Sequence, residues 1–112
     1  MMDARMTEGL ARVRKRFVEE LGPRRNSLVS LRDEVEDAAT PDEIIASIGH
    51  ISHKIAGTAA TVGFARLGGV AAELDDFIGR QNEGGAMPSN ELFGLLEDLI
   101  ALSDHILDAK DL

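Results

Sequence analysis

Three histidines are the side chains of this chain with the most evident chemistry, because an imidazole can act as a nucleophile, a proton carrier or a metal ligand. His50 and His53 are three residues apart, a spacing that places both on one face of a helix. His105 follows Asp104 near the end of the last periodic segment, where we expect a solvated residue that suits the helix dipole. The absence of cysteine excludes disulfides and thiolate zinc sites.

His53 stands on the polar side of its predicted helix. At about 100° per residue, His53 lies roughly 170° from the middle of the apolar face of residues 44–62. That face consists of Ile44, Ile48, Ile51, Ile55, Ala59 and Val62. Gly57 follows His53 by one turn, although glycine inside a helix costs about 1 kcal/mol relative to alanine. We therefore predict that small residues clear an approach to the His53 ring for another protein. They form a docking face of Ala46, Gly49, Ala56 and Ala60 beside Gly57.

The elements that position these residues are helices. Apolar residues recur at three- and four-residue spacing, and no segment alternates strictly as a half-buried strand does. Short joins make successive helices antiparallel neighbours. The sequence predicts an all-α, antiparallel four-helix bundle with a kinked or split N-terminal helix, the kink lying near the Gly22-Pro23 pair. The expected helices span about 7–38, 41–62, 65–81 and 90–109, within a single domain of residues 1–112.

Several residues predict where these helices begin and end. Thr40 can cap the second helix in a capping box with Glu43, with Pro41 at the first helical position. Gly63 stands where a left-handed residue ends that helix, and Ser89 can cap the last one. Residues 82–88 are predicted to form a loop. The core-facing residues expected in the first helix are Leu10, Val13, Phe17, Leu21, Leu28, Leu31 and Val35.

Composition and charge exclude several classes of function. The formal net charge of −8 and the absence of Trp and Tyr argue against a nucleic-acid partner. The basic residues near the N-terminus alternate with glutamates and are expected to form a solvated face. No apolar run is long enough to span a membrane, and no signal-peptide core is present, so we expect a cytoplasmic protein without a membrane partner.

The segment HKIAGTA from His53 to Ala59, with VGF at 62–64 and ELD at 73–75, resembles the histidine phosphotransfer (HPt) domain family. These domains are four-helix phosphocarriers of two-component phosphorelays. The family pattern has an apolar residue two positions after the histidine, Gly four positions after it, and an acid or amide in the next helix. The family's frequent lysine three positions after the histidine is Ala56 in this chain.

The resemblance implies a role for each of these residues. His53 would accept a phosphoryl group, through the outer Nε2, from an aspartate of a receiver domain or hybrid kinase and pass it to a response regulator. Asp75 would orient the ring, and Lys54 or His50 could assist the phosphoryl group. The Mg²⁺ would belong to the receiver, so we expect neither a cofactor nor a metal in this chain. We expect a monomeric phosphocarrier without autokinase activity, since 112 residues leave no room for an ATP-binding domain.

Two other interpretations remain open from the residues alone. In one, a bundle of the same fold acts only as a protein-interaction module and His53 is never phosphorylated. In the other, His50 and His53 hold a metal ion, although a metal site needs three or four ligands.

Overall fold

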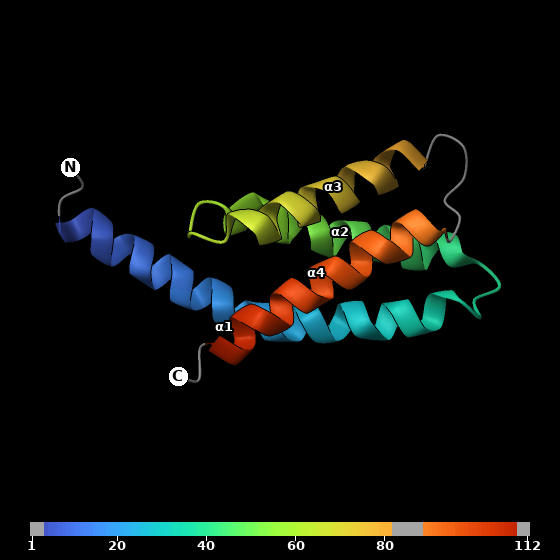
Figure 1. Ribbon diagram of the computed structural model, residues 1–112, viewed down its shortest axis with the longest axis horizontal. Helices are drawn as coiled ribbons and strands as arrows, with labels where there is room; N and C mark the ends of the chain where they lie inside the picture. Colours follow the sequence, from blue (N-terminus) through green and yellow to red (C-terminus); the bar gives the residue numbers. More distant parts are fainter. Residues whose placement is uncertain (1–3, 82–88, 110–112) are drawn as a thin grey trace.

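The computed structural model describes residues 4–81 and 89–109, with side chains from residue 7 onward. This part of the chain forms four helices: α1 (Ala4–Val35), α2 (Pro41–Ala59), α3 (Ala65–Gln81) and α4 (Asn90–Ala109) (Figure 1). The all-α four-helix fold is confirmed. None of these helices has the length and apolar character that a membrane span requires. The loop predicted at 82–88 lies outside the described residues.

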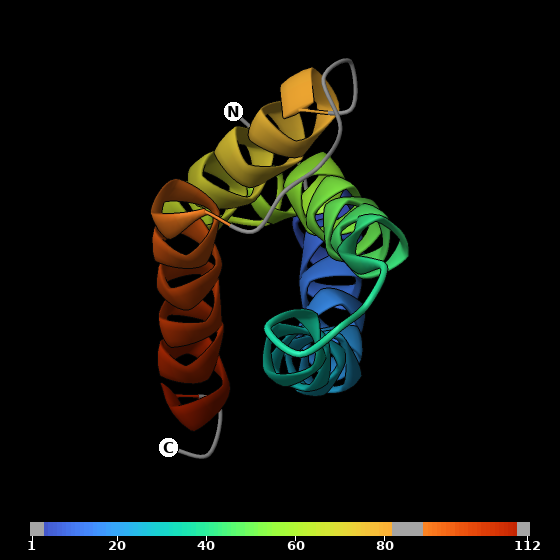
Figure 2. The same cartoon turned by 90° about the vertical axis from the view of Figure 1, so that its right-hand side faces the viewer.

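The four helices pack as a ring of neighbours, seen end-on in Figure 2. Among the described residues, the backbones approach closely between α1 and α2, α2 and α3, α3 and α4, and α4 and α1, whereas no Cα atoms of the diagonal helix pairs lie within 8 Å of each other. Two ion pairs set the register between the antiparallel α1 and α4. Arg25 pairs with Asp104 at 2.6 Å and Arg32 with Glu97 at 3.0 Å, seven residues apart on both helices.

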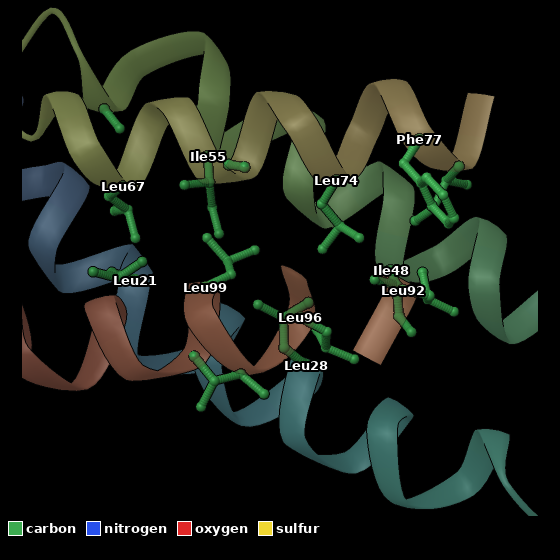
Figure 3. Packing of buried hydrophobic residues seen from close by; sticks show 14 of the residues in the cluster. Leu21, Leu28, Ile48, Ile55, Leu67, Leu74, Phe77, Leu92, Leu96 and Leu99 are labelled. Atoms are coloured by element: carbon green, nitrogen blue, oxygen red, sulfur yellow. The ribbon is translucent and has the colours of Figure 1, made fainter. Parts of the chain in front are cut away.

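The core is one continuous cluster along the axis of the bundle. Ile48 and Ile55 from α2 and Leu96 and Leu99 from α4 are fully buried and lie between the helices (Figure 3). All four helices contribute buried apolar side chains, which is the arrangement that makes a small bundle stable.

The long first helix is only partly covered by the others. Phe17, Leu21, Leu28 and Val35 are buried as predicted, but Val13 is 46 % exposed and the prediction of its burial was wrong. The reason is length, because α1 has 32 residues and the other three helices have 17 to 20. Its N-terminal part therefore extends past the turn between α2 and α3 (Figure 1).

Proline bends α1 without dividing it. The helix is continuous through Pro23, so the split alternative was wrong, and it changes direction midway along its length (Figure 1). Proline lacks the amide proton of an interior helical hydrogen bond, which accounts for a bend at this position. The helix ends at Val35, three residues before the predicted end, and α2 ends at Ala59, three residues before its predicted end at 62.

The predicted helix ends are partly confirmed. Gly63 adopts a φ of 98°, and the amides of Gly63 and Phe64 donate to the carbonyls of Ala60 and Ala59, a Schellman arrangement. The hydroxyl of Ser89 accepts a hydrogen bond from the Leu92 amide at 3.1 Å.

The cap predicted for the second helix is not made. Thr40 precedes α2, and Pro41 begins it as predicted. The Thr40 side chain makes no capping hydrogen bond, so the predicted capping box with Glu43 is wrong.

Glycines allow α2 and α3 to approach each other closely. A Cβ atom added at Gly68 would lie 3.2 Å from the backbone nitrogen of Ala60, and one added at Gly49 would lie 3.1 Å from Cγ2 of Ile78. Both distances are shorter than ordinary van der Waals contacts. The α2–α3 pair therefore has a separation that larger side chains at these two positions would not permit.

The adjacent glycines Gly68 and Gly69 provide a matched test of this approach. Gly69→Ala should raise the free energy of unfolding by up to about 1 kcal/mol, since an added Cβ there meets nothing within 4 Å. Gly68→Ala should give no such stabilisation, because its Cβ would press against the backbone of Ala60, and Gly68→Val should be clearly destabilising. Urea unfolding of the three variants measures the differences. Equal stabilisation by both alanines would contradict the inferred close contact.

Candidate functional site

His53 lies on the flank of α2 that faces α3. The buried residues of α2 are Ile45, Ile48, Gly49, Ser52, Ile55 and Ala59. At about 100° per residue, His53 lies about 110° from the middle of this buried face, so the predicted position opposite the core was wrong. The difference arises because Ile44 and Ile51, which entered the predicted face, are only half-buried. His53 is nevertheless exposed, with 75 % of its side chain accessible.

This position brings His53 together with Asp75 of α3. Nδ1 of His53 lies 2.8 Å from Oδ2 of Asp75, whose side chain is partly covered at 37 % exposure. An ionised carboxylate can only accept a hydrogen bond, so Nδ1 carries the proton and donates it. In the neutral form of a ring oriented in this way, the lone pair is on Nε2. Asp75 was the partner expected for this role, and the structure places it at hydrogen-bond distance.

Small residues surround the exposed side of the histidine. Ala46, Gly57 and Ala60 are exposed, and Ala56 is half-buried against the core. A Cβ added at Gly57 would meet no atom within 4 Å, so packing within this chain does not require a glycine there. Gly49 is an exception to the predicted docking face. It is buried against Ile78, and its small size serves the contact between α2 and α3.

Within the described residues, neither of the two predicted helpers of the phosphoryl group is hydrogen-bonded to the His53–Asp75 pair. Lys54 lines a groove against α1 together with Phe17 and Glu20, on the other flank of α2 from Asp75. His50 is exposed, and no hydrogen bond joins it to His53 in the described part of the chain. The structure therefore brings together His53, Asp75 and the Gly57 clearance, but it does not direct Lys54 toward the histidine.

The metal interpretation requires a third ligand beside His50 and His53. Across residues 7–81 and 89–109, no group of three His, Asp or Glu side chains is placed to hold a metal ion. Asp75 contacts Nδ1 of His53 directly, at a distance typical of a hydrogen bond. The geometry around His53 is that of an oriented imidazole.

The groove that holds Lys54 was missed by the sequence analysis. It is lined by Val13, Arg16, Phe17, Glu20, Arg24, Lys54 and Thr58. Val13 and Phe17 had been assigned together to the core face of the first helix. The available signal was the unequal length of the helices, because a 32-residue helix cannot be covered throughout by partners of 17 to 20 residues.

The site has one nucleophile and one group that orients it. His53 lies on the outer surface of the bundle, on a rigid helix, where a second protein can reach it. Group transfer at such a site needs the reacting partner to supply the remaining catalytic groups.

Comparison with known proteins agrees with this arrangement. The family model described as "Hpt: Hpt domain" matches residues 12–105. No curated protein and no solved structure matches the chain. The matched residues include parts of all four helices and both members of the His53–Asp75 pair. The chain therefore belongs to the Hpt domain family, the four-helix histidine phosphotransfer domains that act as phosphocarriers in two-component phosphorelays.

Proposed function

We propose that His53 is the phosphoryl acceptor of this protein, taking the group from an aspartyl phosphate of a receiver domain and passing it to another receiver. The observation that carries the proposal is the 2.8 Å contact of Nδ1 with Asp75 on an imidazole whose side chain is 75 % exposed. That contact orients the ring while Nε2 keeps its lone pair for attack. The donor would be a receiver domain, including that of a hybrid histidine kinase, and the acceptor a response regulator.

The transfer requires no proton to leave the ring. Nε2 attacks the phosphorus, the bond between phosphorus and the aspartate oxygen breaks, and the aspartate leaves as a carboxylate. The proton on Nδ1 stays in place, so the phosphorylated ring is an imidazolium whose positive charge lies beside the Asp75 carboxylate. The reverse attack, by an aspartate oxygen of the next receiver, releases a neutral imidazole in the same tautomer.

The protein's own contribution is positioning. Phosphoryl transfer depends mainly on alignment and on neutralisation of the phosphoryl oxygens, and a Mg²⁺ ion in the receiver would supply that neutralisation. The bundle provides a rigid helix, a ring fixed by Asp75 and clearance at Gly57. We therefore propose a carrier that has no autokinase activity and that turns over only with its partners.

The first prediction concerns the acceptor. Incubation with a phosphorylated receiver domain and Mg²⁺ should place acid-labile, base-stable phosphate on the wild-type protein and none on His53→Gln, because glutamine has no nucleophilic ring nitrogen. His50→Gln and His105→Gln are the matched controls and should keep the label. Label that persists on His53→Gln would identify another acceptor. If no receiver labels the wild type, the alternative of a non-phosphorylated interaction module is favoured.

The second prediction concerns the carboxylate. Asp75→Ala should lower the rate of transfer by about tenfold to a hundredfold, because loss of an orienting partner typically has effects of this size. The rate of Asp75→Asn should fall between those of the wild type and Asp75→Ala, since an amide oxygen accepts the hydrogen bond from Nδ1–H but carries no charge. Asp76→Ala is the control, because that neighbouring carboxylate pairs with Arg80. Single-turnover rates measure the effect, and equal rates for Asp75→Ala and Asp76→Ala would remove Asp75 from the mechanism.

The third prediction separates folding from access at Gly57. Gly57→Ala should raise the free energy of unfolding by about 1 kcal/mol, because the site is exposed and has room for a Cβ. Gly57→Arg should remain folded but transfer at least about tenfold more slowly, since its side chain occupies the approach to the ring. Gly94→Arg, at an open glycine on α4, is the control. Unimpaired transfer by Gly57→Arg would refute the role assigned to the small residues.

A further inference from the structure

Val13 is the one large hydrophobic residue that is exposed among the described side chains. It lies on the part of α1 that extends past the turn between α2 and α3 (Figure 1). Together with Phe17 of α1 and Thr58 of α2 it lines a groove of about 440 Å³, which we name the α1–α2 groove. The complete lining is Val13, Arg16, Phe17, Glu20, Arg24, Lys54 and Thr58.

The groove is positively charged in a protein whose net charge is −8. Its lining has three basic side chains and one acid. Glu20 is already bridged by Arg16 at 3.1 Å and by Arg24 at 3.4 Å. Lys54 has no carboxylate partner in the described part of the chain, and Arg16 is highly exposed at 80 %. One carboxylate cannot neutralise three cations, so the groove has an apolar floor and a net positive rim, which are complementary to an apolar side chain flanked by carboxylates.

The groove adjoins the proposed phosphoryl site. Lys54 and Thr58 follow His53 and Gly57 directly in α2, so the same helical turns carry both features. Asp75 lies on the opposite flank, followed by the exposed Asp76. His53 thus stands between the basic groove on the α1 side and, on the α3 side, the carboxylates Asp75, which contacts the ring, and Asp76, which pairs with Arg80.

We propose that the α1–α2 groove docks an acidic helix of the partner receiver domain, which inserts an aliphatic side chain against Val13 and Phe17 and sets carboxylates against Arg16 and Lys54. The inference rests on the proposed function, since it names the surface by which the receiver is held while its aspartate meets His53. The net positive charge of the groove favours the orientation that places the acidic helix of the receiver on the α1 side of His53. A receiver turned around would lose its contacts with Arg16 and Lys54.

The chemistry of the contact predicts how transfer responds to salt and to substitution. Attraction between exposed charges mainly accelerates association and is screened as the ionic strength rises. Arg16→Glu reverses a charge at the rim, and Val13→Asp places a carboxylate on the apolar floor. Neither residue touches His53 in the structure, so the reactivity of the ring itself should be unaffected.

The experiment compares two phosphoryl donors on each variant. With a phosphorylated receiver domain, Arg16→Glu and Val13→Asp should lower kcat/KM at least about tenfold, mainly through KM. With phosphoramidate, a donor too small to need docking, both variants should be labelled on His53 at the wild-type rate. Raising the salt from about 0.05 M to about 0.5 M should slow the wild type with the receiver and affect Arg16→Glu much less. Arg66→Glu, the same charge change at the exposed start of α3, is the matched control and should behave as the wild type.

The outcomes distinguish this proposal from the proposed function. If the receiver labels the wild type and both groove variants with kcat/KM values within about twofold of one another, the receiver docks elsewhere, although His53 remains the acceptor. Slower labelling by phosphoramidate in the variants would show damage to the site itself and would also overturn the inference. If the wild type forms a dimer in light scattering that Val13→Asp dissociates, a second copy of this chain occupies the groove. Failure of every receiver to label the wild type overturns the proposed function and this inference with it.

Discussion

The close approach of α2 and α3 is the constraint on which the site depends. Gly68 leaves room for the backbone at Ala60, and Gly49 leaves room for Ile78, so both ends of this helix pair are tightly packed. Helix axes are commonly 8–10 Å apart, and small side chains at the contact give the shorter separations. A histidine and an aspartate on neighbouring helices reach hydrogen-bond distance only when their helices hold a fixed separation and rotation. The 2.8 Å contact between His53 and Asp75 is a consequence of this packing.

The rest of the bundle supplies rigidity at a distance from the chemistry. Leucines and isoleucines of all four helices form one buried cluster, and two ion pairs set the register of α1 against α4. A site on helices held in this way is more accurately positioned than one on loops, and an exposed imidazole needs such support because water competes for its hydrogen bonds. Gly57 does not contribute to this rigidity. It weakens α2 by about 1 kcal/mol with no packing benefit inside the chain, as open glycines such as Gly69 and Gly94 do in their helices, and its proposed role in access rests on its place one turn after His53.

The fold could be predicted from the sequence because its signals are local. Helical periodicity, the proline at position 41 and the caps at Gly63 and Ser89 each depend on a few neighbouring residues, and the bounds of α3 and α4 agree with the structure. The rotation of α2 was predicted less well. Isoleucines occur on both sides of its buried face, so periodicity alone could not tell Ile45 from Ile44.

The remaining differences depend on contacts between helices. The helical wheel placed Gly49 on an exposed face, whereas Ile78 of α3 covers it in the structure. Val13 is exposed because the other three helices are too short to cover it. Lys54 lies in a groove that exists only because α1 packs beside α2. Asp75 was found from a family pattern, because its distance to His53 is a property of two helices and is not encoded by either one alone.

The charges around His53 also bear on how strongly this protein would hold a phosphoryl group. A phosphoryl group carries about −1.5 to −2 charges at neutral pH, which the positive ring would offset only in part, here on a protein of net charge −8. In the proposed phosphorylated state, Asp75 would stabilise the ring cation through Nδ1 but would not reach the phosphoryl oxygens on the other side of the ring. The lysine frequent in the family is Ala56 here, and Lys54 faces α1. Within the part of the chain that the structure describes, no cation is hydrogen-bonded to His53, so a phosphoryl group on Nε2 would gain its main neutralisation from a docked receiver and its Mg²⁺. Under the proposed function, such a carrier would hold the group weakly on its own and transfer it when a partner docks.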